Sequence, residues 1–322
     1  MSATTENISP IMSATTVTLD DSHDLVLHVG TTDHANGAVS FRVNKGVLQM
    51  GSEPFNAMLA ADLAEATQSE ISFPHDSPQY FEPLLKIMHG KVEDLPSNLS
   101  MEALVELAKL CDKYGVTKVV APFVANWLGQ QKDPDTAWKL CSKSRDCLFV
   151  AHVFDLVEDR ATLLSLLIMN TTVDRETKTL IYEGEDGTIV YVDGTSLPKK
   201  LLVKIRRIRM KVLNSIRVKC TFAMLTALAM NTCSCENATC KFYYVGLLIS
   251  IYKDLGLLPI LRHPAMMTSS IFNYLDSMER MVAAYPPDFR GPGYCSLDPL
   301  PMPWMWSSVT QIFEKNGLLE RE

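Results

Sequence analysis

Apolar residues recur at the spacing of an α-helix in three neighbouring stretches of the first half of the chain. In residues 77–89 they occupy positions i, i+3, i+4 and i+7, which predicts one continuous apolar stripe. Ser100 is a suitable N-cap for the second stretch, and Val116–Leu128 forms the third. The stripe positions of the first two helices are Phe81, Leu84, Leu85 and Met88, and Leu104, Leu107, Ala108 and Cys111. Each helix should therefore bury one face in a shared core.

Ahead of these helices the pattern is that of short strands. Leu25–Val29 is apolar and Val39–Val43 alternates, and the residues between them are rich in turn formers. Short helical pieces are expected at Lys45–Met50 and Pro54–Leu63, followed by a third strand at Glu70–Phe73. This mixture predicts an α+β fold with a small sheet and helical hairpins.

The chain divides into three parts. Residues 1–21 are rich in Ser and Thr, contain the repeat Met1–Thr5 and Met12–Thr16, and are expected to be a disordered tail. Residues 22–130 make the α+β domain, which a polar, proline-containing stretch closes. Residues 137–322 are expected to be a mostly helical C-terminal region.

One β-hairpin is predicted inside the C-terminal region, where Thr179–Tyr182 and Thr188–Val192 alternate around a Gly-rich turn. Near the C-terminus, Trp304 and Trp306 stand in a Pro-rich stretch that reads as a loop, and we expect them to fill a hydrophobic groove. The expected helices are two or three in Thr136–Met169, one or two in Leu197–Met230, and one each in Phe242–Leu255, Thr268–Ala284 and Val309–Asn316.

Composition and charge narrow the class of protein. Apolar residues make up 47% and charged residues 21% of the 322 residues, as in ordinary globular proteins. The net charge of −7 argues against nucleic acid or an anionic membrane as the partner of the whole molecule. No apolar stretch approaches the length of a membrane span, and the N-terminus lacks the pattern of a secretory signal. The eight cysteines show no extracellular framework spacing, so we expect an intracellular protein with reduced thiols, in the cytoplasm or the nucleus.

The order of elements and a set of spaced residues resemble the BTB/POZ family. The match begins with Asp24 before the first strand and ends with a Tyr and an aliphatic residue at Tyr114 and Val116. Between them the chain follows the family's pattern at Phe41, Val43, Lys45, Leu48, Ser52, Phe55, Phe81, Leu84, Leu85, Gly90, Leu104, Leu107 and Ala108. The resemblance covers about a third of the chain and implies the BTB/POZ fold.

The resemblance also implies a function in protein–protein contact. Family members form homodimers through their first helix and strand and dock partners on exposed helices. By this resemblance Asp24, Asn44 and Lys45 belong to the dimer face. Asn44 stands where the family commonly has His, which removes a titratable group and puts the usual dimerisation in question. We therefore expect a self-associating scaffold or regulatory protein and not an enzyme.

A second resemblance supports an alternative function. Family members that present substrates to cullin-type ubiquitin ligases carry an aliphatic-x-Glu motif after the short helix, and Leu63-Ala64-Glu65 stands there. The competing interpretation is a solvated Glu near a helix end. Replacing Glu65 by Ala would abolish capture of a cullin if the motif works this way.

A strongly basic segment stands out from the acidic remainder. Residues 199–219 hold nine basic residues and no acid, which leaves 21 basic against 37 acidic residues, or −16, elsewhere. Apolar residues at helical spacing make the segment an amphipathic helix with a cationic face. That face is either solvated and internally paired, a nuclear-import patch of a transcription-linked regulator, or a nucleic-acid contact. The basic residues are Lys199, Lys200, Lys204, Arg206, Arg207, Arg209, Lys211, Arg217 and Lys219.

One cysteine cluster could hold a metal. Cys233, Cys235 and Cys240 could supply thiolates to a structural zinc ion, although the spacing differs from the usual C-x2-C knuckle. The alternative is that these are small core residues, and we expect no cofactor. The cysteines precede Gly256-Leu-Leu-Pro259, which resembles a stretch in fungal BTB-domain proteins with a helical C-terminal region.

Catalytic motifs are missing from the sequence. It contains no nucleophile elbow, phosphate-binding loop, zinc-protease motif or dinucleotide fingerprint. The seven histidines are scattered, and His89 at a helix end is expected to be a hydrogen-bonded structural or surface residue. An enzyme with an unrecognised site in the C-terminal half remains the alternative from a different class.

Overall fold

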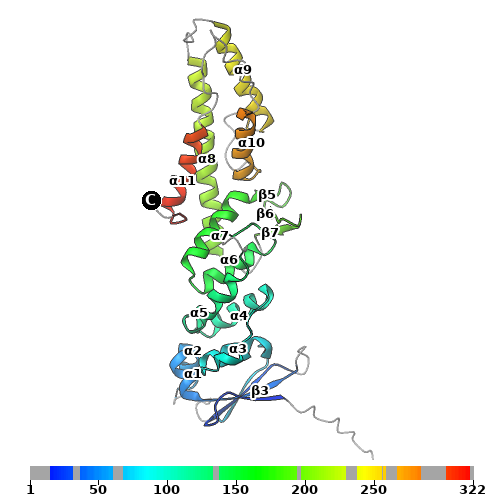
Figure 1. Cartoon of the computed structure of the whole chain (residues 1–322), viewed down its shortest axis with the longest axis vertical. Coiled ribbons are helices and arrows are strands. Elements are labelled where there is room, and N and C mark those ends of the chain that lie inside the picture. Colours follow the sequence, from blue (N-terminus) through cyan, green and yellow to red (C-terminus); the bar gives the residue numbers. More distant parts are fainter. Residues whose placement is uncertain are drawn as a thin grey trace, which may run out of the picture. The chain divides into compact units, whose positions relative to one another are not determined.

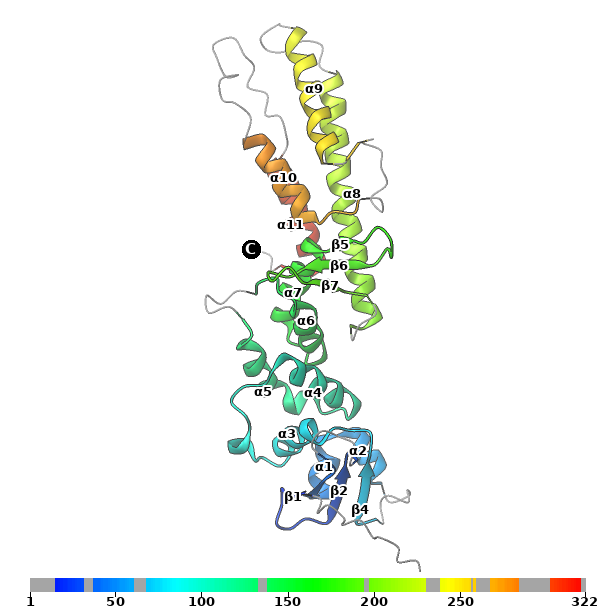
Figure 2. The same ribbon diagram turned by 90° about the vertical axis from the view of Figure 1, so that its right-hand side faces the viewer.

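A computed structural model describes residues 15–31, 37–60, 68–132, 138–193, 197–229, 238–255, 257–258, 267–283 and 302–319 (Figures 1 and 2). The chain divides into two compact units. The first unit runs to Gln131 and also includes Val150–Leu156, and the second comprises Lys132–Phe149 and the residues from Val157 onward. Helix α6 (Ser144–Val153) therefore has residues in both units.

A four-stranded sheet forms one side of the first unit. Its order is β1-β3-β2-β4, with β2 and β3 antiparallel and the outer pairs β1–β3 and β2–β4 parallel. The strands are β1 (Thr15–Thr18), β2 (Leu25–Val29), β3 (Val39–Val43) and β4 (Glu70–Phe73). The last three strands are those expected from the pattern. The tail was expected to extend to residue 21, and this boundary was wrong, because β-branched Thr and Val residues pair with the free edge of β3.

The helices of the first unit begin at residues that the sequence marks as caps. The side chains of Asn44, Ser52 and Ser100 each accept a hydrogen bond from a backbone N–H of the first turn of α1, α2 and α4. The helices are α1 (Lys45–Gly51), α2 (Glu53–Met58), α3 (Pro78–Met88), the 3-10 turn η2 (Val92–Asp94), α4 (Met101–Lys113) and α5 (Thr117–Gly129).

Aromatic rings fill the space between the sheet and these helices. Phe55 stacks on Tyr114 with ring centroids 4.8 Å apart. Phe73 and Phe81 meet the same Tyr114 ring edge-on at 5.8 and 5.4 Å. The expected stripe of α3 is buried at Phe81, Leu84 and Leu85. The residues that carried the family resemblance are thus mainly the core of this unit.

The second unit is mostly helical and holds a small antiparallel sheet in the order β5-β6-β7. The hairpin predicted there is β6–β7, and a third strand of two residues, β5, pairs with β6. Helix α8 is a single continuous helix, and both views show α9 running beside it (Figures 1 and 2). The elements are α7 (Val157–Asn170), β5 (Thr172–Val173), β6 (Leu180–Glu183), β7 (Ile189–Tyr191), α8 (Lys199–Ala229), α9 (Ala238–Asp254), α10 (Ile271–Ala283) and α11 (Met302–Lys315).

The prediction of a Pro-rich loop at Trp304 and Trp306 was wrong. Both residues lie in α11, which starts at Met302 and has Pro303 in its first turn. Proline is compatible with that position because its missing N–H would have no helical partner there. Trp306 is partly exposed, and the neighbouring Met305 fills the buried position.

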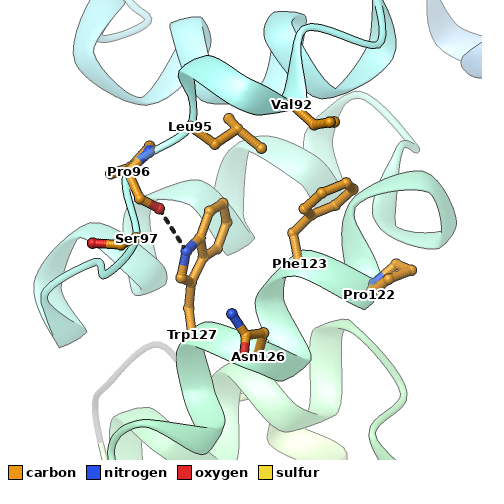
Figure 3. A pocket seen from close by; sticks show the side chains of 8 residues that line it. All are labelled: Val92, Leu95, Pro96, Ser97, Pro122, Phe123, Asn126 and Trp127. Atoms are coloured by element: carbon orange, nitrogen blue, oxygen red, sulfur yellow. Dashed lines mark hydrogen bonds between the residues drawn. The ribbon is translucent and has the colours of Figure 1, made fainter.

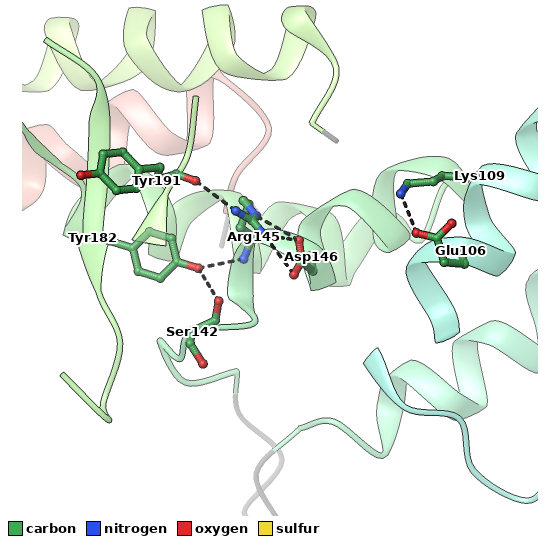
Figure 4. A network of polar contacts seen from close by, with 7 residues as sticks. All are labelled: Glu106, Lys109, Ser142, Arg145, Asp146, Tyr182 and Tyr191. Carbon is green, nitrogen blue, oxygen red and sulfur yellow. Dashed lines mark hydrogen bonds and ion pairs between the residues drawn. The ribbon is translucent and has the colours of Figure 1, made fainter. Parts of the chain in front are cut away.

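A buried tyrosine holds the start of α6 against the small sheet (Figure 4). The hydroxyl of Tyr182 donates to the carbonyl of Ser142 at 3.2 Å and accepts from the backbone N–H of Arg145 at 3.1 Å. The Arg145 guanidinium in turn donates to the carbonyl of Tyr191 at 3.2 Å and to Asp146. Burial raises the pKa of Tyr182 to about 12, so the hydroxyl keeps its proton and this donor role at physiological pH.

None of the helices in the described ranges combines the length with the apolar character that crossing a membrane requires.

Candidate protein-interaction surfaces

Asp24 and Lys45, two residues assigned to the dimer face, contact each other. The backbone N–H of Lys45 donates to Asp24 Oδ1 at 2.7 Å, at the point where α1 begins. The Lys45 ammonium donates to the carbonyl of Gln68 at 2.9 Å, just before β4. This arrangement ties the start of α1 to β2 and to the residues before β4. Asp24 and Lys45 thus fix the surface around α1 through contacts within the chain.

Asn44 lies beside them, where the family commonly has His, and it is the N-cap of α1. Its side-chain oxygen accepts a hydrogen bond from the backbone N–H of Val47 at 3.3 Å, and the backbone N–H of Asn44 donates to His89 Nε2 at 3.2 Å. The other ring nitrogen of His89 contacts the carbonyl of Leu85 at 2.9 Å. A neutral ring with the proton on Nδ1 satisfies both contacts. Desolvation lowers the pKa of His89, in keeping with a neutral ring, so the ring is a hydrogen-bonded structural residue.

A buried polar cluster joins α2 to α4. Ser52 Oγ accepts from Phe55 N at 3.0 Å and donates to the carbonyl of Tyr114 at 2.6 Å. The Tyr114 hydroxyl donates to the buried Asp76 carboxylate at 2.5 Å, and the Lys113 ammonium pairs with that carboxylate at 2.7 and 2.8 Å. Sequence reasoning missed Asp76, since its partners lie 37 and 38 positions later.

A shallow concavity of about 250 Å³ lies between α5 and the segment that follows η2 (Figure 3). Phe123 and Trp127 form one wall, and Val92 and Leu95 face them from the other. The indole N–H of Trp127 donates to the carbonyl of Pro96 at 3.0 Å, which fixes the ring. The described residues that line this concavity carry no charge, so it suits an apolar group.

The fold and these contacts agree with a comparison to known families. Residues 18–126 match the family model of the BTB/POZ domain. This part of the chain, called the BTB domain below, includes every residue on which the resemblance rested, from Asp24 to Val116. No curated protein matches the chain in a sequence search.

The match establishes the general role of this part of the molecule. BTB/POZ domains are protein-interaction modules that mediate self-association and binding to other proteins, and the family is not typically enzymatic. The match spans about a third of the chain, so it bears on the BTB domain and not on the helical second unit. The likeness to fungal members stays a prediction.

The basic segment lies on α8, and its apolar stripe is buried as expected. Ile205, Ile208 and Val212 are inaccessible to solvent. The exposed basic side chains of this stretch are Lys199, Lys200, Arg206, Arg207 and Lys211, and Lys204 is half-buried. Desolvation, with Arg160 and Arg207 nearby, lowers the pKa of Lys204.

Arg209 was placed on the cationic face, and this prediction was wrong. Arg209 is 2% exposed, and its guanidinium points inward and donates to backbone carbonyls of residues 267–269. Arg206 remains at the surface but pairs with Asp193 at 2.6 Å. The cationic face is therefore smaller than the sequence suggested.

Two predicted sites fall outside the described residues. Leu63 and Glu65 of the cullin-type motif belong there, and so do Cys233 and Cys235. Cys240 lies at the start of α9, where the structure describes the backbone alone. Within the described residues, no three His, Cys, Asp or Glu side chains gather as a metal site. The adaptor motif and the zinc site stay predictions.

Several described cysteines are core residues. Cys111, Cys147 and Cys220 are buried and have free thiols in place of disulfides in the described part of the chain. Burial raises the pKa of the Cys147 thiol to about 12 and that of Cys220 to about 11. Because the thiolate is the reactive form, these three thiols are poor nucleophiles at neutral pH.

Proposed function

We propose that this chain is a scaffold or regulatory protein whose BTB domain binds a second copy of itself and other proteins. The observation that carries the proposal is the match of residues 18–126 to a family of interaction modules. The internal bonds of Asp24, Asn44 and Lys45 support it, because they preserve the surface around α1 although Asn replaces the usual His.

Helix α1 also offers an apolar contact. Met50, on its last turn, is 85% exposed, more than any other large apolar side chain in the described part of the chain. Methionine is adaptable and enriched at protein interfaces, and its burial removes apolar area from water. A two-fold symmetric dimer would use such a residue twice, since both protomers present the same patch.

The test is light scattering on the size-fractionated full chain over a concentration series, for wild type and Met50→Lys. A dimer is expected for the wild type. Lys in its place would bring two charges into the interface and weaken association at least about tenfold. Val203→Lys is the matched control, because Val203 is 62% exposed on α8 in the other unit. A wild type that stays monomeric at every concentration would refute self-association, and an unaltered M50K dimer would remove α1 from the interface.

The adaptor alternative rests on Leu63-Ala64-Glu65 and the nuclear alternative on the exposed part of the α8 basic face. Pull-down of a cullin with Glu65→Ala, and cellular localisation after neutralising Lys199, Lys200 and Arg207, would distinguish them from the scaffold function. Unchanged capture or unchanged distribution would remove each.

A further inference from the structure

The second unit contains a pocket in which cationic side chains lie beside apolar walls. It has a volume of about 320 Å³, and α8 contributes Arg206, Arg209, Met210 and Leu213 to its lining. These positions are i, i+3, i+4 and i+7, so one face of the helix forms this wall. Residues of the small sheet, among them Leu180 of β6, line it as well. Pockets of this volume are of the size that small molecules occupy.

Arg209 is buried in this lining and only partly satisfied. Its Nη2 donates to the carbonyls of Met267, Thr268 and Ser269 at 3.2, 3.4 and 2.7 Å. Its Nη1 is shielded from solvent and has no hydrogen-bond partner among the described residues. Desolvation lowers the pKa of Arg209 to about 10, so the group still carries its charge at neutral pH. A buried cation with an unused donor is costly, and an anion would relieve that cost.

The charge of the surrounding lining has the same sign. Lys178 and Arg206 also line the pocket, and none of the described residues that line it is acidic. Arg206 is paired with Asp193 at 2.6 Å, while the Lys178 ammonium donates to the carbonyl of Arg175 and also interacts with the charge of the nearby Asp174 carboxylate. Arg209 therefore contributes a buried positive charge with an unused donor to the lining, and Lys178 adds an exposed positive charge beside it.

We propose that this pocket binds a small organic anion, a carboxylate or phosphate monoester with an apolar group attached. Arg209 and Lys178 hold the anionic head, because charge-assisted hydrogen bonds to such groups are the strong ones. Met210, Leu213 and Leu180 cover the apolar part. This site lies in the second unit and does not depend on the proposed self-association.

The test is calorimetric titration of the full chain with hexyl phosphate and with hexanoate, using hexan-1-ol as the uncharged control. At least one of the two anions is expected to bind at one equivalent, and the alcohol is not. Comparison of the two anions then identifies the preferred head group. Absence of binding by both at millimolar concentrations, or equal binding of the alcohol, would overturn the proposal.

Variants locate the binding site on the chain. Arg209→Met should weaken binding of the anion at least about tenfold, and Lys178→Gln should weaken it several-fold. Lys178 is exposed, so its replacement keeps the test valid even if the buried Arg209 variant fails to fold. Lys211→Gln is the matched control, since it removes one charge from the exposed part of α8 outside the pocket. Unchanged affinity in Lys178→Gln, or an equal loss in Lys211→Gln, would show that the anion binds elsewhere.

Discussion

Replacing Tyr114 by Phe removes one hydroxyl from the end of α4 and leaves the aromatic core in place. The ring still stacks on Phe55 at 4.8 Å, so the change isolates the 2.5 Å hydrogen bond to Asp76. Asp76 is 7% exposed, and its second partner, the Lys113 ammonium, stays available. Hydrogen bonds to charged groups contribute about 1.5–3 kcal/mol. We expect a loss of free energy of unfolding at the lower end of this range, because Lys113 compensates in part.

Hydrogen exchange followed by mass spectrometry assigns this loss to the BTB domain. The slowest amides of β4 and α4 report on the opening of the whole domain. A loss of about 1.5 kcal/mol makes them exchange roughly tenfold faster. Tyr80→Phe is the control, because it removes a tyrosine hydroxyl from α3 of the same domain. If exchange in Tyr114→Phe stays within about twofold of wild type, the hydrogen bond to Asp76 does not stabilise the domain as argued.

Two further predictions concern the polar contacts around the helix starts. The pKa of His89 lies below its usual 6.5, so the unfolded chain binds more protons. The stability that neutral His89 supports is therefore present above about pH 6.5 and is lost as the pH falls through the folded pKa. Urea midpoints between pH 8 and 5 should fall more steeply in wild type than in His89→Gln; equal slopes would contradict this. Ser52→Ala removes the cap of α2 and a bond to the carbonyl of Tyr114, and should cost about 1–3 kcal/mol in urea unfolding. An unchanged midpoint would show that water replaces both bonds.

The BTB domain could be predicted well because its signals are local. The stripe of Phe81, Leu84 and Leu85 follows from spacing within one helix, and Ser100 marks the start of the next. Tertiary context decided what spacing could not. Thr15–Thr18 has no apolar face of its own and becomes a strand only because the edge of β3 is free to pair with it.

Arg209 shows why the sites of the second unit were less predictable. On α8 it stands among exposed basic residues, and nothing in its neighbourhood separates it from them. Its burial depends on three carbonyls that lie 58–60 positions later in the chain. Single-sequence patterns record helical faces but not the partners that tertiary folding brings to them. The polar contact of Asp76 with Tyr114 was missed for the same reason.

The position of β1 at the edge of the sheet has a consequence for shortened forms of this protein. A protease or a later translation start that removes residues up to Thr18 would leave β3 as the outer strand. The backbone groups of Val39–Arg42 that now pair with β1 would then be free to pair with a strand of another molecule. Shortened chains should therefore aggregate where the full chain stays in solution, and recombinant forms should begin ahead of Thr15.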